Sequence, residues 1–197
     1  MKAAGIILAG GKSSRFQGNK AFAELASQRL IDRIISVLKD VFPKLILVTN
    51  SPSEYQGLGV EVVSDLISGR GPLSGIHTGL VVSPCDLNLV TACDMPFVNR
   101  ALAAYLVGQA RPADDAVVPL VGGYPEPLFA VYRKTCLPFI EASLQEGKYK
   151  VTSFYGSVRI RYVSEEELAP FGGARSFFNI NTREDLKKAS RIVRPGP

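Results

Sequence analysis

Short continuous runs of apolar residues alternate with stretches of helical spacing over the first half of the chain. Between residues 28 and 41 the apolar positions recur every three or four residues, which is typical of an amphipathic helix. Further helices are expected at residues 73–82 and 99–109, and strands at residues 4–8, 45–49, 60–64 and 87–93. Because buried parallel strands form uninterrupted apolar runs, this alternation predicts an α/β fold: a mostly parallel sheet with helices on both faces.

The second half of the chain is less regular. Its pattern predicts strands at residues 116–120, 128–132 and 158–163 and a helix at residues 138–146. Thr182 followed by Asp185 resembles a capping box, which predicts a last helix ending near Val193. Since no linker separates the two halves, we expect residues 1–193 to form one domain and residues 194–197 to form a loose tail.

Composition narrows the class of protein. The 197 residues are 46% hydrophobic and 21% charged, which is ordinary for a globular protein and argues against a disordered one. The net charge of +5 suits an anionic partner but does not distinguish a nucleotide from nucleic acid or a membrane surface. No apolar run approaches the roughly 18 residues that span a bilayer. We expect a cytoplasmic protein with no membrane segment, whose Cys85, Cys93 and Cys136 are reduced core residues.

Several predicted strands end in residues that can bind ligands. The first is followed by Gly10-Gly11, the next two by Asn50 and Asp65, and the fourth by Asp94. In open α/β sheets, ligands bind beyond the carboxyl ends of the strands. The sequence therefore predicts one sheet edge that gathers glycines, an amide and two carboxylates.

The loop after the first strand carries phosphate-binding chemistry. Its glycines allow a backbone to approach phosphate closely, and Arg15 and Lys20 can neutralise phosphate charge. A Walker A motif is excluded, because Gly11-Lys12-Ser13 lacks a glycine at the required upstream position. The alternative is a tight strand-to-helix turn whose basic residues are only solvated.

Asp94 is the strongest candidate for a metal ligand. A carboxylate at a strand end beside phosphate-binding groups suits Mg²⁺, although it could instead cap a helix or a turn. Asp65 is equally compatible with a surface turn and with a ligand contact. Asp114-Asp115 is interpreted as a solvated turn, and His77 as a packed or surface residue. Because phosphoryl transfer needs mainly positioning and charge neutralisation, the pattern indicates nucleotide chemistry without naming the substrates.

Several segments of the chain, taken together, resemble the sequence motifs of the molybdenum cofactor guanylyltransferase (MobA) family. They occur in the family's order and span nearly the whole chain. The segments that carry the resemblance are Leu8-Ala9-Gly10-Gly11-Lys12-Ser13-Ser14-Arg15 with Gly18 and Lys20, then Asn50, Asp65, Gly71-Pro72-Leu73-Ser74-Gly75, Cys93-Asp94-Met95-Pro96-Phe97, Pro127-Leu128 and Asn179-Ile180-Asn181-Thr182.

The resemblance implies a single-domain, Rossmann-like nucleotidyltransferase fold that transfers GMP from GTP to the terminal phosphate of Mo-molybdopterin. Pyrophosphate would leave, with Mg²⁺ as cofactor. The N-terminal half would bind the nucleotide and the C-terminal half the acceptor. By this resemblance the nucleotide contacts are Leu8, Ala9, Gly10, Gly11, Lys20, Asn50 and Asp65, and Asp94 binds Mg²⁺.

Four further residues are candidates for the site. Arg15 is expected to clamp the triphosphate, and Asn181 to be a second ligand on the metal side. Lys148 and Lys150 could meet the acceptor phosphate, although a solvated helix–loop junction is the competing interpretation.

Two positions depart from the family pattern. Asn19 stands where the family usually has Asp, and Phe16 where it usually has Met. Asn19 removes a negative charge and could weaken the orientation of Lys20, whereas Phe16 is interpreted as a packing exchange.

The nearest alternative is a molybdenum cofactor cytidylyltransferase, which carries Ala where Gly10 stands. Glycine leaves room for a purine, so GTP is favoured over CTP. Other nucleotidylyltransferases, a nucleotide or cofactor carrier without turnover, and a nucleic-acid binder remain alternatives. The basic residues of this sequence do not form a run interleaved with aromatic residues, so the sequence does not favour nucleic-acid binding. A monomer with transient contacts to molybdopterin-delivering and acceptor proteins is expected.

Overall fold

The computed structural model describes residues 3–10, 16, 18–67 and 69–193. Its main sheet has the strand order β10-β7-β9-β6-β1-β4-β5, and β8 pairs with β7. β9 is antiparallel to both of its neighbours, whereas the other neighbouring strands on this path are parallel, so the mostly parallel sheet is confirmed. The strands are β1 (Ala3–Leu8), β4 (Leu45–Thr49), β5 (Glu61–Ser64), β6 (Leu87–Ala92), β7 (Ala116–Val121), β8 (Tyr124–Pro125), β9 (Phe129–Arg133) and β10 (Ile160–Val163).

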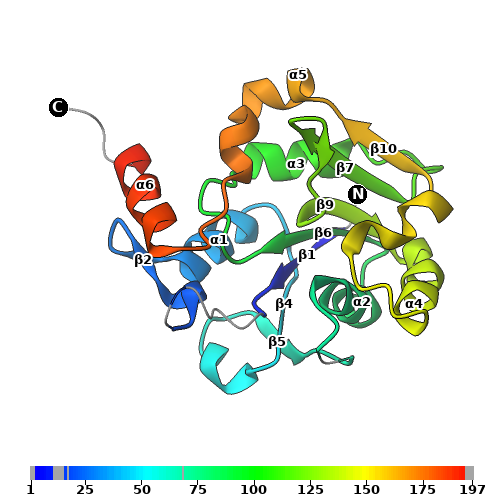
Figure 1. Ribbon diagram of the computed structural model, residues 1–197, viewed down its shortest axis with the longest axis horizontal. Helices are drawn as coiled ribbons and strands as arrows, with labels where there is room; N and C mark the ends of the chain where they lie inside the picture. Colours follow the sequence, from blue (N-terminus) through cyan, green and yellow to red (C-terminus); the bar gives the residue numbers. More distant parts are fainter. Residues whose placement is uncertain (1–2, 11–15, 17, 68, 194–197) are drawn as a thin grey trace.

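Helices cover both faces of this sheet, as the apolar pattern predicted (Figure 1). α1 and α3 pack on one face, and α2 and α4 pack on the other. α6 lies apart from the sheet, beside the small β2–β3 hairpin (Figure 1). The helices are α1 (Leu30–Lys39), α2 (Pro72–Val82), α3 (Arg100–Gly108), α4 (Leu137–Gln145), α5 (Glu165–Leu168) and α6 (Arg183–Val193). Within the described residues, each helix is too short or too polar to cross a bilayer.

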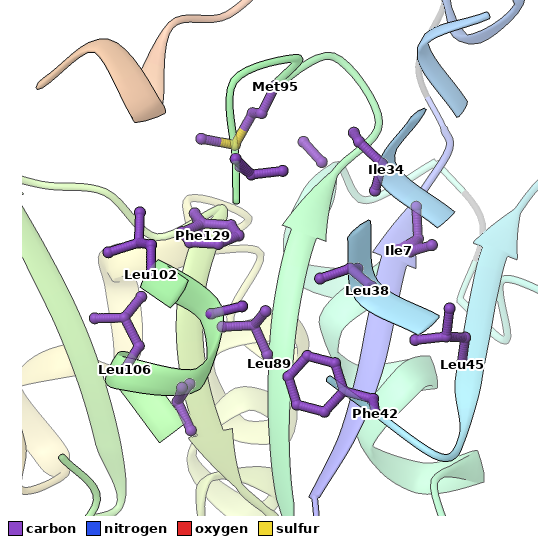
Figure 2. Packing of buried hydrophobic residues seen from close by; sticks show 14 of the residues in the cluster. Ile7, Ile34, Leu38, Phe42, Leu45, Leu89, Met95, Leu102, Leu106 and Phe129 are labelled. Atoms are coloured by element: carbon purple, nitrogen blue, oxygen red, sulfur yellow. The ribbon is translucent and has the colours of Figure 1, made fainter. Parts of the chain in front are cut away.

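The α1 and α3 face contains the larger apolar cluster (Figure 2). Ile7 and Leu89 point from neighbouring strands toward Leu38 of α1, and all three side chains are fully buried. Burial of such a side chain contributes roughly 1.5–3 kcal/mol relative to exposure. This packing holds the ends of β1 and β6 beside each other, which fixes the edge where the predicted site residues lie.

On the opposite face, α2 approaches β1 unusually closely. A Cβ built on Gly79 would lie 2.5 Å from Cγ2 of Ile6, and one on Gly75 would lie 3.1 Å from a methyl of Leu8. These two glycines therefore let the helix backbone rest directly on the strand. The N-terminus of α2 is thereby held near the carboxyl end of β1.

The predicted elements are confirmed to within a few residues, and the differences have local causes. α1 begins at Leu30 rather than residue 28, because β2 (Glu24–Leu25) and β3 (Gln28–Arg29) form a hairpin before it. β10 begins at Ile160 because the 3₁₀ segment η4 (Val151–Ser157) precedes it. Thr182 and Asp185 exchange reciprocal hydrogen bonds at the start of α6, as the capping pattern predicted. The predicted tail, 194–197, is outside the described residues.

Candidate active site

The carboxyl ends of β1, β4, β5 and β6 meet at one edge, as predicted. Leu8 pairs with Val48 on one side and with Ala92 on the other. The backbone continues this adjacency past the strands, since the Cys93 amide donates to the Leu8 carbonyl at 3.1 Å and the Asp65 amide donates to the Thr49 carbonyl at 3.2 Å. The loops that carry Gly10, Asn50, Asp65 and Asp94 therefore leave neighbouring strands at the same edge.

Three predicted site residues come together at this edge. The Lys20 ammonium forms an ion pair and a hydrogen bond with Oδ2 of Asp94. Lys20 also donates to Oδ1 of Asn181, with 3.3 Å between the two atoms. These residues are separated by 74 and 161 positions in the sequence, so the fold alone assembles the cluster. We refer to Lys20, Asp94 and Asn181 as the Lys20 cluster.

Lys20 begins a 3₁₀ turn, η1 (Lys20–Phe22), which Asn19 caps. The Asn19 side-chain oxygen accepts from the Ala21 amide at 3.1 Å, and its amide group donates to Glu54 at 2.8 Å and to the Tyr55 hydroxyl at 2.9 Å. Burial raises the pKa of Tyr55 to about 12, so its hydroxyl stays protonated at neutral pH. Asn19 thus anchors the turn that presents Lys20, and the effect of losing a negative charge at this position stays a prediction.

Asp94 is only 7% exposed, and a hydrogen bond to its backbone helps to fix its position. The Ile180 amide donates to the Asp94 carbonyl at 2.9 Å, which also brings Asn181 to the cluster. The Oδ1 atom of Asp94 is buried and has no hydrogen-bond partner among the described residues. A buried carboxylate oxygen without a partner is costly, so this atom is suited to bind a cation or a ligand donor.

The described residues contain no group of three His, Cys, Asp or Glu side chains that could enclose a metal ion. Mg²⁺ does not require such an enclosure, because it is commonly held by one or two carboxylates together with substrate phosphates and water. The unpartnered Oδ1 of Asp94 therefore fits a magnesium ion that reaches the site with a phosphate-bearing substrate.

Asp65 has protein partners that the sequence did not reveal. Its carboxylate accepts from the Ser74 hydroxyl at 2.7 Å and from the Thr78 hydroxyl at 2.9 Å, both on α2. It also accepts from the Ile67 amide at 3.2 Å. Asp65 therefore ties the loop after β5 to the first turns of α2, and its contact with a nucleotide stays a prediction.

The first loop is described only in part. Leu8 and Ala9 are buried, and the Leu8 carbonyl and the Ala9 amide are already paired with neighbouring strands, so their contact with a nucleotide stays a prediction. Gly10 is exposed, and a Cβ built on it would meet no atom of the described residues within 4 Å. Neither packing nor a positive φ explains glycine at this position. The predicted roles of Gly11 and Arg15 fall outside the described residues, and Asn50 is exposed at the end of β4.

The two lysines near residue 149 do not join the Lys20 cluster. Lys148 is largely exposed and pairs with nearby Glu146 at 2.7 Å, and Lys150 is exposed. Between them, Tyr149 lies under the guanidinium of Arg70, 4.7 Å from the ring centroid. The contact of Lys148 and Lys150 with an acceptor phosphate therefore stays a prediction, beside the interpretation of this segment as a solvated junction.

Two predictions about other polar residues need correction. Asp115 is not simply solvated, because its carboxylate accepts from the Thr135 hydroxyl at 2.7 Å and from the Arg159 amide at 2.9 Å. Partial burial raises its pKa, but these hydrogen bonds outweigh that effect and lower the pKa below its usual value. Cys85 is only half-buried, because it lies in the loop before β6, outside the core.

The predictions for Cys93, Cys136, His77 and Phe16 are confirmed. Cys93 and Cys136 are buried free thiols, and burial raises the pKa of Cys93 to about 12, with a further increase from the Asp94 charge. His77 is packed, with 3.0 Å between its Nε2 and Glu141 Oε1. Phe16 is buried against the cluster that contains Leu25, so it serves packing as predicted.

Comparison with known proteins identifies the family. Residues 5–160 match the MobA-like NTP transferase domain. A probable molybdenum cofactor guanylyltransferase from Pelotomaculum thermopropionicum is 46% identical over 190 residues, covering 96% of this chain and 92% of the relative. A molybdenum cofactor guanylyltransferase from Desulfosudis oleivorans is 40% identical over 194 residues, covering 98% and 96%.

A solved structure supports the same conclusion. Molybdopterin-guanine dinucleotide biosynthesis protein A from Archaeoglobus fulgidus superposes with a TM-score of 0.82 at 30% identity, covering 96% of this chain and 97% of that one. The chain therefore belongs to the molybdenum cofactor guanylyltransferases of the MobA-like NTP transferase family.

Proposed function

We propose that this chain transfers GMP from GTP to the terminal phosphate of Mo-molybdopterin, releasing pyrophosphate. The observation that carries the proposal is the buried Asp94 carboxylate, which has one oxygen paired with Lys20 and the other without a partner among the described residues. The names of its relatives, which are guanylyltransferases of the molybdenum cofactor, support the same activity.

The chemistry requires charge neutralisation more than proton transfer. The acceptor phosphate is already ionised at neutral pH, so no general base is needed. Lys20 would move from Asp94 toward the triphosphate and neutralise part of its charge, with Arg15 as a second clamp. Asp94 would then hold Mg²⁺ with Asn181 beside it, and the bound metal would supply electrostatic stabilisation to the transferring and leaving phosphates.

The choice of base depends on Gly10. A side chain there would meet none of the described residues, so its absence serves a bound molecule better than it serves packing against them. We propose that this space accommodates guanine, with Leu8 to Gly11 lining the base through their backbone and with Asn50 and Asp65 as further nucleotide contacts. On this proposal, a Gly10→Ala variant would bind GTP less tightly while folding normally.

The direct test supplies Mo-molybdopterin and Mg²⁺ to the purified chain with each of four α-labelled nucleoside triphosphates. We expect labelled dinucleotide from GTP alone, with no label transferred when Mo-molybdopterin is omitted. Preferred transfer from CTP would contradict the argument from Gly10. Binding of GTP and Mo-molybdopterin without transfer from any nucleotide would indicate a carrier instead of an enzyme.

We further propose that the chain works in the cytoplasm, where its free thiols remain reduced, as a monomer that meets delivery and acceptor proteins transiently. Sedimentation of the purified chain across a range of concentrations tests the monomer. A nucleic-acid shift assay at moderate salt, for which we expect no retained complex, tests the absence of that partner.

A further inference from the structure

A groove of about 440 Å³ opens on the α1 face, and none of the Lys20 cluster lines it. Three segments that are distant in sequence form it: the stretch from Gln28 through α1, the loop at residues 96–99, and residues 172–176. Small-molecule sites typically enclose about 300–1,000 Å³, so the groove is large enough for a phosphorylated organic ligand. It shares the segment after Asp94 with the proposed active site but faces different residues.

Two arginines and no carboxylate line this groove within the described part of the chain. Asp32 on α1 and Asp40 just after α1 are the acidic residues closest in sequence to Arg33, and both have other partners. Asp32 pairs with Arg29 and Asp40 pairs with Arg100. The groove therefore presents two cationic side chains, Arg33 and Arg175, without an ion-pair partner among the described residues.

Arg33 is oriented by a neutral group. Its Nε donates to the carbonyl oxygen of Pro96 at 3.0 Å, which fixes one edge of the guanidinium. The two terminal nitrogens remain as donors, and their planar arrangement matches phosphate oxygens. Because the side chain is already ordered and half-buried, binding an anion would cost little further conformational entropy.

Arg175 is also oriented by neutral groups. Its guanidinium lies over the ring of Phe97, 5.0 Å from the centroid, and Nη2 donates to the Ile192 carbonyl at 3.5 Å. Phe97 itself packs against Phe178, with 5.8 Å between ring centroids. A ring and a carbonyl hold this arginine without neutralising its charge.

We propose that the groove is a second anion-binding site, which takes a small molecule bearing a phosphate or pyrophosphate group. Arg33 and Arg175 would both bind the anion, and Gln28 and Ser36, which also line the groove, would add polar contacts. The proposal does not depend on the proposed GMP transfer, because the groove residues are separate from Lys20, Asp94 and Asn181.

The test uses a fluorescent reporter that this chain allows, because its sequence contains no tryptophan. Phe97→Trp places a single tryptophan in the groove, and Tyr124→Trp places one on exposed β8 as a matched reporter. Titration with inorganic pyrophosphate is expected to change the emission of the F97W protein saturably and to leave that of the Y124W protein flat. Adding R33Q and R175Q to the F97W protein is expected to weaken binding roughly tenfold or more.

Equilibrium dialysis of labelled pyrophosphate against chains with Phe97 intact provides the second measurement. It uses K20A as the parent, so that the active site is weakened, and compares K20A/R33Q/R175Q with the matched charge control K20A/R111Q. We expect binding to fall only when both groove arginines are replaced. An unchanged dissociation constant in that variant, an equal loss in the R111Q control, or no measurable binding by K20A would each overturn the proposal.

Discussion

The Lys20 cluster and the turn that carries Lys148 and Lys150 both present lysines that the sequence offered as phosphate contacts. Lys20 contacts a buried carboxylate and an amide from distant parts of the chain, and Asn19 fixes the turn that carries it. Lys148 contacts a carboxylate two residues away, and both groups are well exposed. An exposed pair of this kind contributes little, since solvent screens it. The comparison shows that partners and burial, rather than charge alone, distinguish a lysine held in a cluster of distant residues from an exposed one.

The largest effect is expected from Asp94→Ala. Without the carboxylate, neither the metal nor the resting position of Lys20 is supported, so GMP transfer should fall on the order of 10³-fold, at the upper end of losses for one electrostatic group. The measurement is labelled-dinucleotide formation, with Mo-molybdopterin binding followed separately and expected to persist. Asp40→Ala, which removes an exposed surface pair, is the matched control. Activity near wild type in D94A would rule out the metal assignment.

A smaller loss is expected from Lys20→Ala, because Asp94 would still be present. Transfer should fall about 10²-fold, with a higher KM for GTP, since one cationic group near the phosphates is removed. Steady-state kinetics at varied GTP concentrations measure both values. Lys44→Ala provides the control, because Lys44 forms only a partly exposed pair with Glu61. Unchanged kinetics would remove Lys20 from the phosphate site.

Substitutions at Asn19 test how much the turn beneath Lys20 matters while Lys20 and Asp94 themselves are unchanged. Asn19→Ala removes a cap and should lower the free energy of unfolding by about 1 kcal/mol, as measured by urea denaturation. We expect kcat/KM to fall less than in K20A, because the lysine remains but its turn is less well held. Asn19→Asp keeps the capping oxygen and loses the donors to Glu54 and Tyr55, so its effect should be smaller on the cap. A loss in N19A as large as that in K20A would assign Asn19 a direct role.

The smallest effect is expected from the paired substitution Lys148→Ala and Lys150→Ala. Because Lys148 and Lys150 are exposed, the KM for Mo-molybdopterin should change by about twofold or less. Measurement at several ionic strengths tests the same point, since a real acceptor contact would weaken with salt. A tenfold higher KM would move these lysines from the solvated surface into the acceptor site.

The sheet and the edge at which the candidate site lies could be predicted because both follow from local patterns combined with one rule. Continuous apolar runs mark buried parallel strands, and parallel strands bring the residues after them to one edge. Asp94 was recognisable because it follows a strand, whereas its contact with Lys20 and the approach of Asn181 became visible only in the structure. Asp65 was ambiguous, because its partners Ser74 and Thr78 lie on a helix whose depth against β1 depends on Gly75 and Gly79.

The β2–β3 hairpin and the groove beside α1 could not be predicted from such sequence patterns. Residues Ala26 and Ser27 adopt positive φ angles of 52° and 62°, which hairpin turns normally reserve for Asn or Gly, so no turn signal marked the hairpin. The groove depends on three segments that meet only after folding, and none of them has a motif of its own. Long-range packing of this kind leaves no periodicity in the sequence.

The hydrogen bond from the Ile180 amide to the Asp94 carbonyl has a consequence for synthesis of the chain. Because β10 ends at Val163, the segment containing Ile180 and Asn181 leaves the ribosome after the strands of the main sheet. A nascent chain could therefore complete its sheet while the carboxyl edge still lacks its last contributor. The Lys20 cluster would then be the last part of this edge to form, when residues 179–181 dock beside the finished strands.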